Sequence, residues 1–293
     1  MYAGALAMST SVSRRQPMAT GKGRVALRVA GAVLGLVVLV SAGWFGWVRQ
    51  SSAPSPTLQA TLRALASRPC APLQLVGVRG HSDPSTEVGP DVRALILRLR
   101  ARLGQDSQTD VVSLPYEQGP TLGIVPLWVP RDISNGARTL DDYLQDRMAV
   151  CRSEPRVVIA QSEGAGLAHL AFPRIAERVQ AIVLLGDPLH LRSAPYNENL
   201  GTTSNGSLVP WMGMGIDLGR RTWADPVLPA RSSRIRSYCL PHDHVCSQDF
   251  FDRQRSAHLE YRNNPIAAGS GQGVLDLAVD FVVARLGGQT ATS

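Results

Sequence analysis

The stretch RVVIAQSEGAGLA, residues 156–168, places one serine between two contrasting patterns. The apolar run before Ser162 is typical of a buried strand, and the small residues after it can begin a helix. A nucleophilic serine on a sharp strand-to-helix turn needs small residues two positions before and two positions after it, because the turn brings those backbones together. Ala160 and Gly164 meet this requirement, and no other serine of the chain does. A helix N-cap serine is the alternative interpretation.

The chain beyond residue 70 alternates between expected strands and expected helices. Strands are expected at 72–79, 109–116, 156–162, 180–188 and 234–239, and helices at 91–104, 139–151, 164–179 and 274–287. Apolar strands separated by helices predict a parallel sheet covered on both faces, which places the protein in the α/β class. Reactive groups gather at the carboxyl ends of the strands in such sheets, and Ser162 falls at such an end.

The net charge of +7 is concentrated at the start of the chain. Six of the 30 basic residues lie in the first fifty positions, where no acidic residue occurs; subtracting them leaves 24 basic against 23 acidic residues. The remainder is therefore nearly neutral, and it shows no basic stripe with interleaved aromatic residues. We expect no nucleic-acid partner.

Residues 29–48 form an uncharged apolar run bounded by Arg28 and Arg49. Twenty helical residues span roughly 30 Å, the thickness of the hydrocarbon core of a bilayer. We expect a transmembrane anchor that follows a basic cytoplasmic tail, residues 1–28, and holds the rest of the chain outside the cytoplasm. A cleavable signal sequence ending near Ala42 is the alternative, and it predicts a secreted protein.

Residues 49–69 are predicted to link this segment to a globular domain at 70–288. Their Ser/Pro-rich start is typical of a spacer, and 57–68 is expected to form a short helix. No internal repeat is present.

Four cysteines suit an oxidising compartment: Cys70, Cys151, Cys239 and Cys246. Cys239 and Cys246 are close enough to close one loop, which leaves Cys70 to pair with Cys151. Four unpaired thiols are the alternative. A zinc site is disfavoured because no CxxC spacing occurs.

A nucleophilic serine needs a base, and the base needs an acid to orient it. The histidines are His81, His169, His190, His242, His244 and His258. The order Ser…Asp…His along the chain favours Asp243, in the Cys-bounded loop, and His258 after it. His169 lies on the helix that follows Ser162, and we expect it to face solvent or the sheet.

The sequence disfavours two other kinds of site. His242, Asp243 and His244 are a possible set of metal ligands, but adjacent residues do not readily converge on one ion, so the two histidines are expected to be exposed. A nucleotide-binding protein is excluded because VRGHSDP (78–84), after the first strand, is not a Gly-rich phosphate loop.

Three motifs resemble those of cutinase-family serine esterases. The family motif GYSQGA is similar to AQSEGA at 160–165. The family spacing Cys-x-x-x-Asp-x-x-Cys occurs over 239–246, and a PHLxY-like segment occurs as AHLEY at 257–261. Cys151 precedes Ser162 by eleven residues, as in the family. VLLGDP (183–188) and VRG (78–80) also match. The resemblance covers 70–287, and with the N-terminal segment it indicates a membrane-anchored bacterial cutinase-like protein.

The resemblance implies an α/β-hydrolase-type three-layer sandwich with a central parallel sheet and no large lid. It also implies the reaction: Ser162 attacks an ester, His258 moves the proton, and Asp243 stabilises the imidazolium. The backbone N–H groups of His81 and Glu163 are expected to form the oxyanion hole. No cofactor and no metal is expected.

Three residues depart from the family pattern. The family usually has Ser or Thr at His81, Gln at Glu163 and Gly at Ala160. A carboxylate beside a developing oxyanion is unfavourable unless Glu163 points away or pairs with a cation, for which His81 is the candidate. The extra methyl group of Ala160 is a mild change.

We expect a monomeric serine esterase or lipase that acts on lipid or other acyl esters at the outer membrane face, including phospholipids or thioesters. The alternative is a catalytically weak or inactive lipid-binding ectodomain with the same fold. The loop at 189–230 either forms an acyl-binding wall or buries its own apolar side chains, which are Trp211, Met212, Met214, Ile216 and Trp223.

Overall fold

The computed structural model covers the whole chain. The residues it describes are 54–81, 87–104, 108–119, 129–198, 200–202, 204–209, 227, 229–247, 257–267 and 269–287. The predicted membrane segment at 29–48 and the five apolar side chains of the predicted acyl-binding wall lie outside these ranges. Within these ranges, no helix is both long and apolar enough to cross a bilayer.

The centre of the protein is a parallel sheet of five strands. They are β1 (Leu73–Val78), β2 (Thr109–Ser113), β3 (Arg156–Gln161), β4 (Ala181–Leu185) and β5 (Ile235–Tyr238), in the order β2-β1-β3-β4-β5. Every neighbouring pair is parallel, as predicted. β1, β3 and β4 are buried along their whole length, which explains why their sequences are mostly apolar, with Gln74, Arg156 and Gln161 as buried exceptions.

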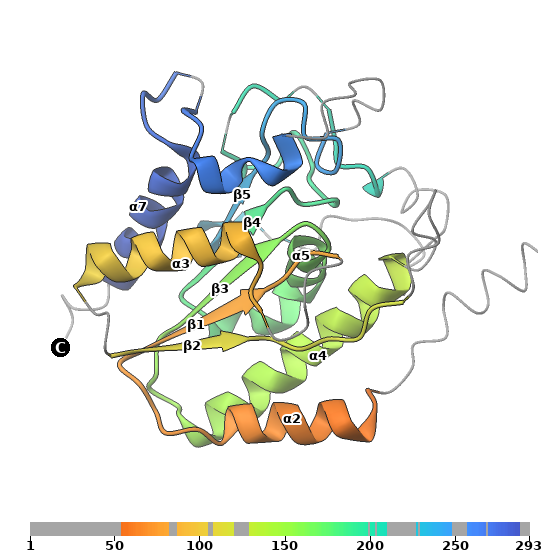
Figure 1. The fold of residues 1–293 in the computed structure, drawn as a ribbon, viewed down its shortest axis with the longest axis vertical. Coiled ribbons are helices and arrows are strands. Elements are labelled where there is room, and N and C mark those ends of the chain that lie inside the picture. Colours follow the sequence, from red (N-terminus) through yellow and green to blue (C-terminus); the bar gives the residue numbers. More distant parts are fainter. Residues whose placement is uncertain are drawn as a thin grey trace, which may run out of the picture. The chain divides into compact units, whose positions relative to one another are not determined.

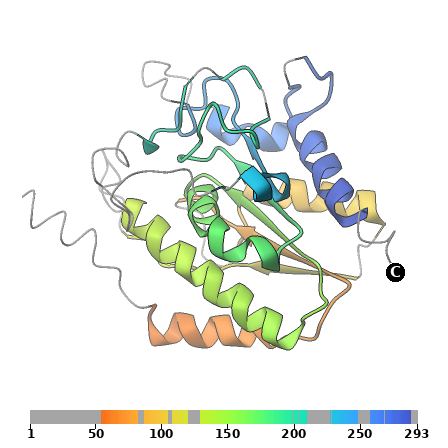
Figure 2. The same cartoon turned by 180° about the vertical axis from the view of Figure 1, so that it is seen from behind.

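Helices cover both faces of the sheet, and the three-layer prediction is confirmed (Figures 1 and 2). One layer contains α2 (Pro56–Ala66), α4 (Val129–Val150) and α5 (Glu163–Ile175), and the other contains α3 (Pro90–Leu103) and α7 (Val274–Gly287). Successive strand residues point to opposite faces. In β3, Val158 and Ala160 therefore join the core under α4 and α5, whereas Val157 and Ile159 join the core under α3 and α7.

Several element boundaries differ from the predicted ones. α4 begins at Val129, ten residues before the predicted start. α5 continues past Pro173 to Ile175 and is followed by a 3₁₀ turn, η1 (Ala176–Arg178). Pro173 lies in the last turn of α5, so the missing N–H removes only one backbone hydrogen bond. The second predicted strand ends at Ser113, three residues early.

The short helix expected at 57–68 forms as α2, inside the range predicted as a linker. Ser55 caps it by accepting a hydrogen bond from the Leu58 N–H at 3.3 Å. Its buried side chains, which include Leu58 and Leu62, join the core that α4 covers. This segment therefore packs as part of the globular unit.

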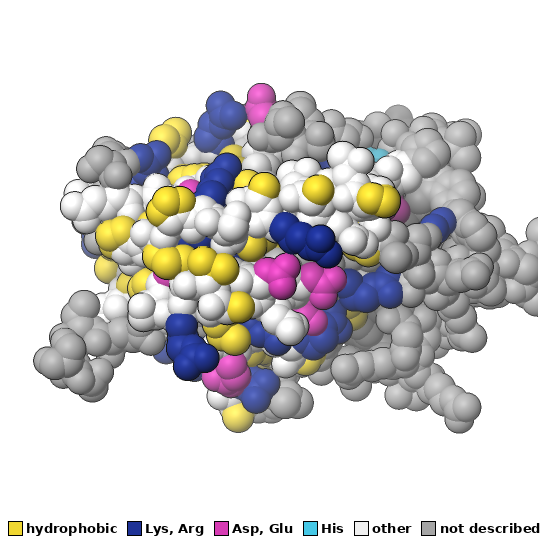
Figure 3. All heavy atoms as spheres, turned by 90° about the horizontal axis from the view of Figure 1, so that it is seen from below, with side chains coloured by type: hydrophobic (Ala, Val, Ile, Leu, Met, Phe, Trp, Pro, Cys, Tyr) yellow, Lys and Arg dark blue, Asp and Glu magenta, His cyan; other side chains and the backbone are white. Residues whose placement is uncertain are grey.

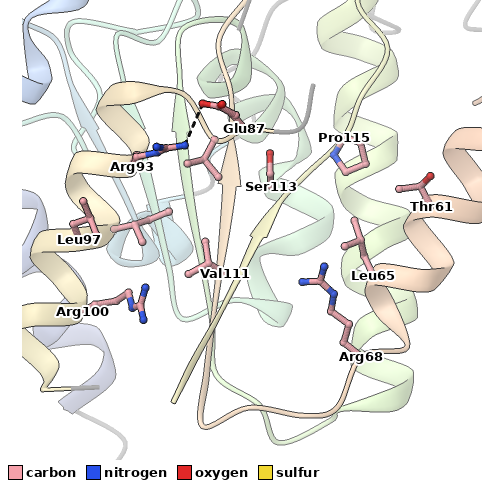
Figure 4. A pocket seen from close by; sticks show the side chains of 12 residues that line it. Thr61, Leu65, Arg68, Glu87, Arg93, Leu97, Arg100, Val111, Ser113 and Pro115 are labelled. Carbon is pink, nitrogen blue, oxygen red and sulfur yellow. Dashed lines mark hydrogen bonds and ion pairs between the residues drawn. The ribbon is translucent and has the colours of Figure 1, made fainter. Parts of the chain in front are cut away.

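A groove of about 750 Å³ lies beside the edge strand β2, between α2 and α3 (Figure 4). Arginine and apolar side chains line it, including Arg68, Arg93 and Leu97. None of the predicted site residues lines this groove.

Figure 3 shows the lower face of the protein, where basic and acidic side chains are interspersed among apolar ones.

The structure contains both predicted disulfides, Cys70–Cys151 and Cys239–Cys246, with Cα atoms 5.5 and 5.7 Å apart. Next to the first, the fully buried Arg147 donates two hydrogen bonds to Glu154, at 2.6 and 2.7 Å. The guanidinium also donates to the carbonyls of Ala66, Arg68 and Pro69. One side chain thus joins the end of α2, the end of α4 and the turn before β3.

Replacing Arg147 with methionine is expected to lower the free energy of unfolding by about 3–5 kcal/mol, because the buried carboxylate of Glu154 loses its closest cationic partner and keeps only the more distant Arg156. Urea unfolding of the oxidised protein measures this loss. Arg98→Met is the control: Arg98 pairs with Asp276 on the surface, and losing that pair should cost less than about 1 kcal/mol. Equal losses in the two variants would contradict the role given to Arg147.

Candidate active site

Ser162 lies on a strained turn between β3 and α5. Its φ of 56° and ψ of −125° are unusual for a residue other than glycine. Its N–H donates to the Leu185 carbonyl at the end of β4 (2.9 Å), which holds the turn in place. The side chain occupies the N-cap position but makes no capping hydrogen bond. The N-cap interpretation is therefore wrong, and the local geometry is that of a nucleophile elbow.

The small residues around Ser162 are needed because neighbouring strands approach closely. A Cβ atom on Gly164 would lie 2.3 Å from the Arg79 carbonyl oxygen and 2.7 Å from that of Val78. Ala160 is fully buried in β3, between Val78 on one side and Leu184 on the other. The constraint on Gly164 thus comes from the end of β1 and not only from the turn itself.

Asp243 and His258 are in direct contact. Nδ1 of His258 lies 2.9 and 3.0 Å from the two carboxylate oxygens of Asp243. A carboxylate only accepts hydrogen bonds, so Nδ1 carries the proton and Nε2 is left as an acceptor. Asp243 also accepts from the Val245 N–H at 2.9 Å and the Tyr261 hydroxyl at 2.8 Å. Burial alone would raise the pKa of Asp243, but His258 and these two donors outweigh burial and lower it.

Tyr261 is a site residue that sequence reasoning missed. Its fully buried hydroxyl lies between the Asp243 carboxylate, the Tyr238 carbonyl (3.2 Å) and the Leu240 N–H, which donates to it at 3.1 Å. Burial raises the pKa of Tyr261, so the hydroxyl stays protonated and keeps its proton to donate. The sequence signal that could have identified Tyr261 is its position at the end of the AHLEY segment, which also contains His258.

Gly186 shows that the three candidate residues meet at one edge of the sheet. Its φ is 62°, and a Cβ atom there would lie 2.8 Å from Asp243 Oδ2 and 2.9 Å from His258 Cε1. The residue before it, Leu185, holds the Ser162 N–H. Ser162, Asp243 and His258 therefore lie around the carboxyl ends of β3, β4 and β5. Among the residues that the structure describes, no hydrogen bond joins the Ser162 hydroxyl to His258.

The two residues predicted to supply the oxyanion hole are in contact through their side chains. His81 follows β1 and Glu163 begins α5, and Nδ1 of His81 lies 2.6 Å from Glu163 Oε2. The Gln118 amide donates to the other carboxylate oxygen of Glu163 at 3.3 Å. The expected pairing of Glu163 with His81 is confirmed. The hydrogen bond that the His81 ring donates to the Glu163 carboxylate is the main cause that raises the pKa of His81.

Two clusters combine histidines with acidic residues, as metal sites do. The ligand atoms of His81, Asp132 and Glu163 lie within 4.8 Å of one another, but two of these residues already satisfy each other, and we assign no metal to them. Asp243 is held by His258, which disfavours the metal set at 242–244. His242 is exposed as expected, whereas His244 is only partly exposed.

His169 does not face solvent. It is fully buried, with Nδ1 2.5 Å from Asp187 Oδ2 and Nε2 3.2 Å from the Tyr196 hydroxyl. Asp187 directly follows Gly186, so this contact joins the helix that begins after Ser162 to the segment that follows β4. The residues next to His169 in the sequence could not reveal Asp187 as its partner, because Asp187 lies eighteen residues further along the chain.

A parallel sheet between two helical layers, with a strained serine turn at its carboxyl edge, is the architecture of the α/β hydrolases. The family model for cutinase matches residues 69–285, and the chain belongs to the cutinase family. Membership of this family supports carboxylic-ester hydrolase activity.

Two solved structures share the fold. The catalytic core domain of acetyl xylan esterase from Trichoderma reesei is 16% identical, with a TM-score of 0.57, and the match covers 74% of this chain and 100% of that one. A cutinase-like protein from Cryptococcus sp. is 20% identical, with a TM-score of 0.54, covering 74% and 97%. A comparison with curated protein sequences found no significant match.

Proposed function

We propose that the protein is a serine carboxylic-ester hydrolase in which Ser162 is the nucleophile, His258 the general base and Asp243 the residue that orients the base. The observation that carries this proposal is the strained Ser162 turn beside the Asp243–His258 hydrogen bond. A strained turn frees the serine hydroxyl for chemistry, and the acid–histidine contact supplies the acceptor that such a hydroxyl needs.

In the proposed reaction, the Ser162 hydroxyl attacks the ester carbonyl while Nε2 of His258 takes its proton. The negative oxygen is stabilised by the backbone N–H groups of His81 and Glu163. The intermediate collapses to an acyl-enzyme, and the departing alcohol takes the proton from His258. Water then attacks the acyl group with His258 as base, which releases the acid and restores Ser162.

We propose lipid or other acyl esters at the outer face of the membrane as substrates, with phospholipids and thioesters within that range. Two observations support a location outside the cytoplasm: the apolar segment at 29–48 and the two disulfides. The segment would either anchor the protein as a single pass or be cleaved to release it. The proposed reaction needs no metal and no cofactor.

A panel of 4-nitrophenyl esters with acyl chains from C4 to C16 tests this function. We expect hydrolysis throughout, with kcat/KM rising towards the longer chains in detergent-dispersed substrate. A preference for C4 would contradict a lipid substrate while leaving the esterase intact. Binding of long-chain esters without hydrolysis would favour the alternative, a catalytically weak or inactive lipid-binding ectodomain. The Glu163 carboxylate beside the proposed oxyanion hole would then explain the weak catalysis.

A further inference from the structure

The proposed oxyanion hole has a carboxylate next to it, because Glu163 supplies one of the two backbone donors. Only 2% of the Glu163 side chain is exposed, so water screens its charge weakly. In the proposed reaction, a negative charge develops at the backbone N–H of the same residue. An uncompensated carboxylate there would oppose the transition state by like-charge repulsion.

The charge has one close cationic partner among the residues that the structure describes. His81, which supplies the other proposed donor, lies 2.6 Å from Glu163 and is 17% exposed. The nearby Arg79 guanidinium donates instead to Gln118 and to the Tyr116 carbonyl. Gln118 contacts Glu163 as a neutral amide. The two residues that supply the proposed backbone donors are thus joined by one contact between their side chains.

We infer that His81 and Glu163 are positioning residues: the His81 imidazolium neutralises the Glu163 carboxylate, and their contact holds the two oxyanion-hole amides at their spacing. This inference rests on the proposed function. It makes turnover depend on the charge of His81 in addition to that of the base His258. The pair acts on the reaction through the amides and through local charge, without contacting the ester.

The charged and titratable groups around the pair set the direction of the pH effect. Glu163 raises the pKa of His81 most, burial lowers it, Asp132 raises it and Arg79 lowers it, with a net rise. Burial raises the pKa of Asp132 to about 6, so this carboxyl is ionised in alkaline solution. Burial keeps Tyr116 protonated by raising its pKa.

The sign of the effect follows from these charges. Below the pKa of His81, imidazolium and carboxylate cancel. Above it, His81 is neutral, and the carboxylates of Glu163 and Asp132 both repel the developing oxyanion. Turnover should therefore fall on the alkaline side through the titration of His81.

The test is the pH profile of kcat on a soluble butyrate ester, from pH 5 to 9.5. The kcat of the wild type should fall on the alkaline side of this range. Glu163→Gln removes the nearer charge at nearly constant shape, so its profile should lose most of the alkaline fall, with the effect of Asp132 remaining, and should exceed the wild-type kcat about tenfold at pH 9. His81→Gln should lower kcat about tenfold at pH 6.5, and His81→Lys should move the alkaline fall to higher pH. Asp276→Asn, at an exposed ion pair, is the control and should keep the wild-type profile.

A second measurement does not depend on activity. NMR titration of histidine-labelled Ser162→Ala protein should show that Glu163→Gln lowers the pKa of His81. The inference would be overturned if Glu163→Gln kept the wild-type alkaline fall, or if it left the titration of His81 unchanged. The proposed function would still stand in that case, provided that ester hydrolysis requires Ser162. A wild type that hydrolyses no ester would overturn the proposed function and this inference with it.

Discussion

Ser162→Ala is expected to lower kcat for ester hydrolysis by up to ~10⁶-fold, because the proposed acyl-enzyme forms on the hydroxyl that this change removes. The same substitution should abolish labelling by a fluorophosphonate probe, which forms a covalent bond with an activated serine. Stopped assays with concentrated enzyme and gel fluorescence of the probe measure the two effects. The alanine variant should keep its fold, since the Ser162 side chain makes no hydrogen bond that caps α5.

Ser153→Ala is the matched control, because Ser153 is exposed at the turn before β3. It should leave both hydrolysis and labelling at the wild-type level. Substantial hydrolysis by Ser162→Ala, in folded protein with both disulfides intact, would show that another group is the nucleophile. Absence of probe labelling in the wild type would favour the lipid-binding alternative.

Asp243→Asn is expected to lower kcat about 10⁴-fold, because an amide at this position no longer imposes the tautomer with its proton on Nδ1 of His258. The carboxylate now accepts from His258, Val245 and Tyr261. An asparagine of the same shape keeps only part of this set and carries no charge to stabilise an imidazolium. The pH profile of kcat on a short ester measures the loss, and KM should change little.

Asp280→Asn provides the comparison for the acid, since Asp280 pairs with Arg102 on the surface. Its kcat should equal that of the wild type. If Asp243→Asn keeps more than a tenth of the activity while Asp280→Asn is unaffected, the Asp243–His258 contact is structural. If the fluorophosphonate probe still labels Ser162 in Asp243→Asn, but more slowly, then the nucleophile is intact and the lost activity comes from the base, His258.

Much of the fold could be predicted because its signals are local. β1, β3 and β4 are buried on both faces, so their apolar runs identify them without knowledge of their neighbours. The start of α4 was not predicted because its polar stretch, RDISNGAR, contains Ser134, Asn135 and Gly136, which are weak helix formers. There, contacts with α5 and α2 stabilise the helix more than local propensity does.

The sequence by itself determined the serine elbow, the order of nucleophile, acid and base, and the loop that the Cys239–Cys246 bond closes. These features depend on residue type and short spacing. Only the tertiary structure decided that Tyr261 holds Asp243, that Gly186 lies against His258, and that His169 is buried against Asp187. Each of these contacts joins segments brought together by the parallel sheet, whose long crossovers place residues far apart in the chain at one edge.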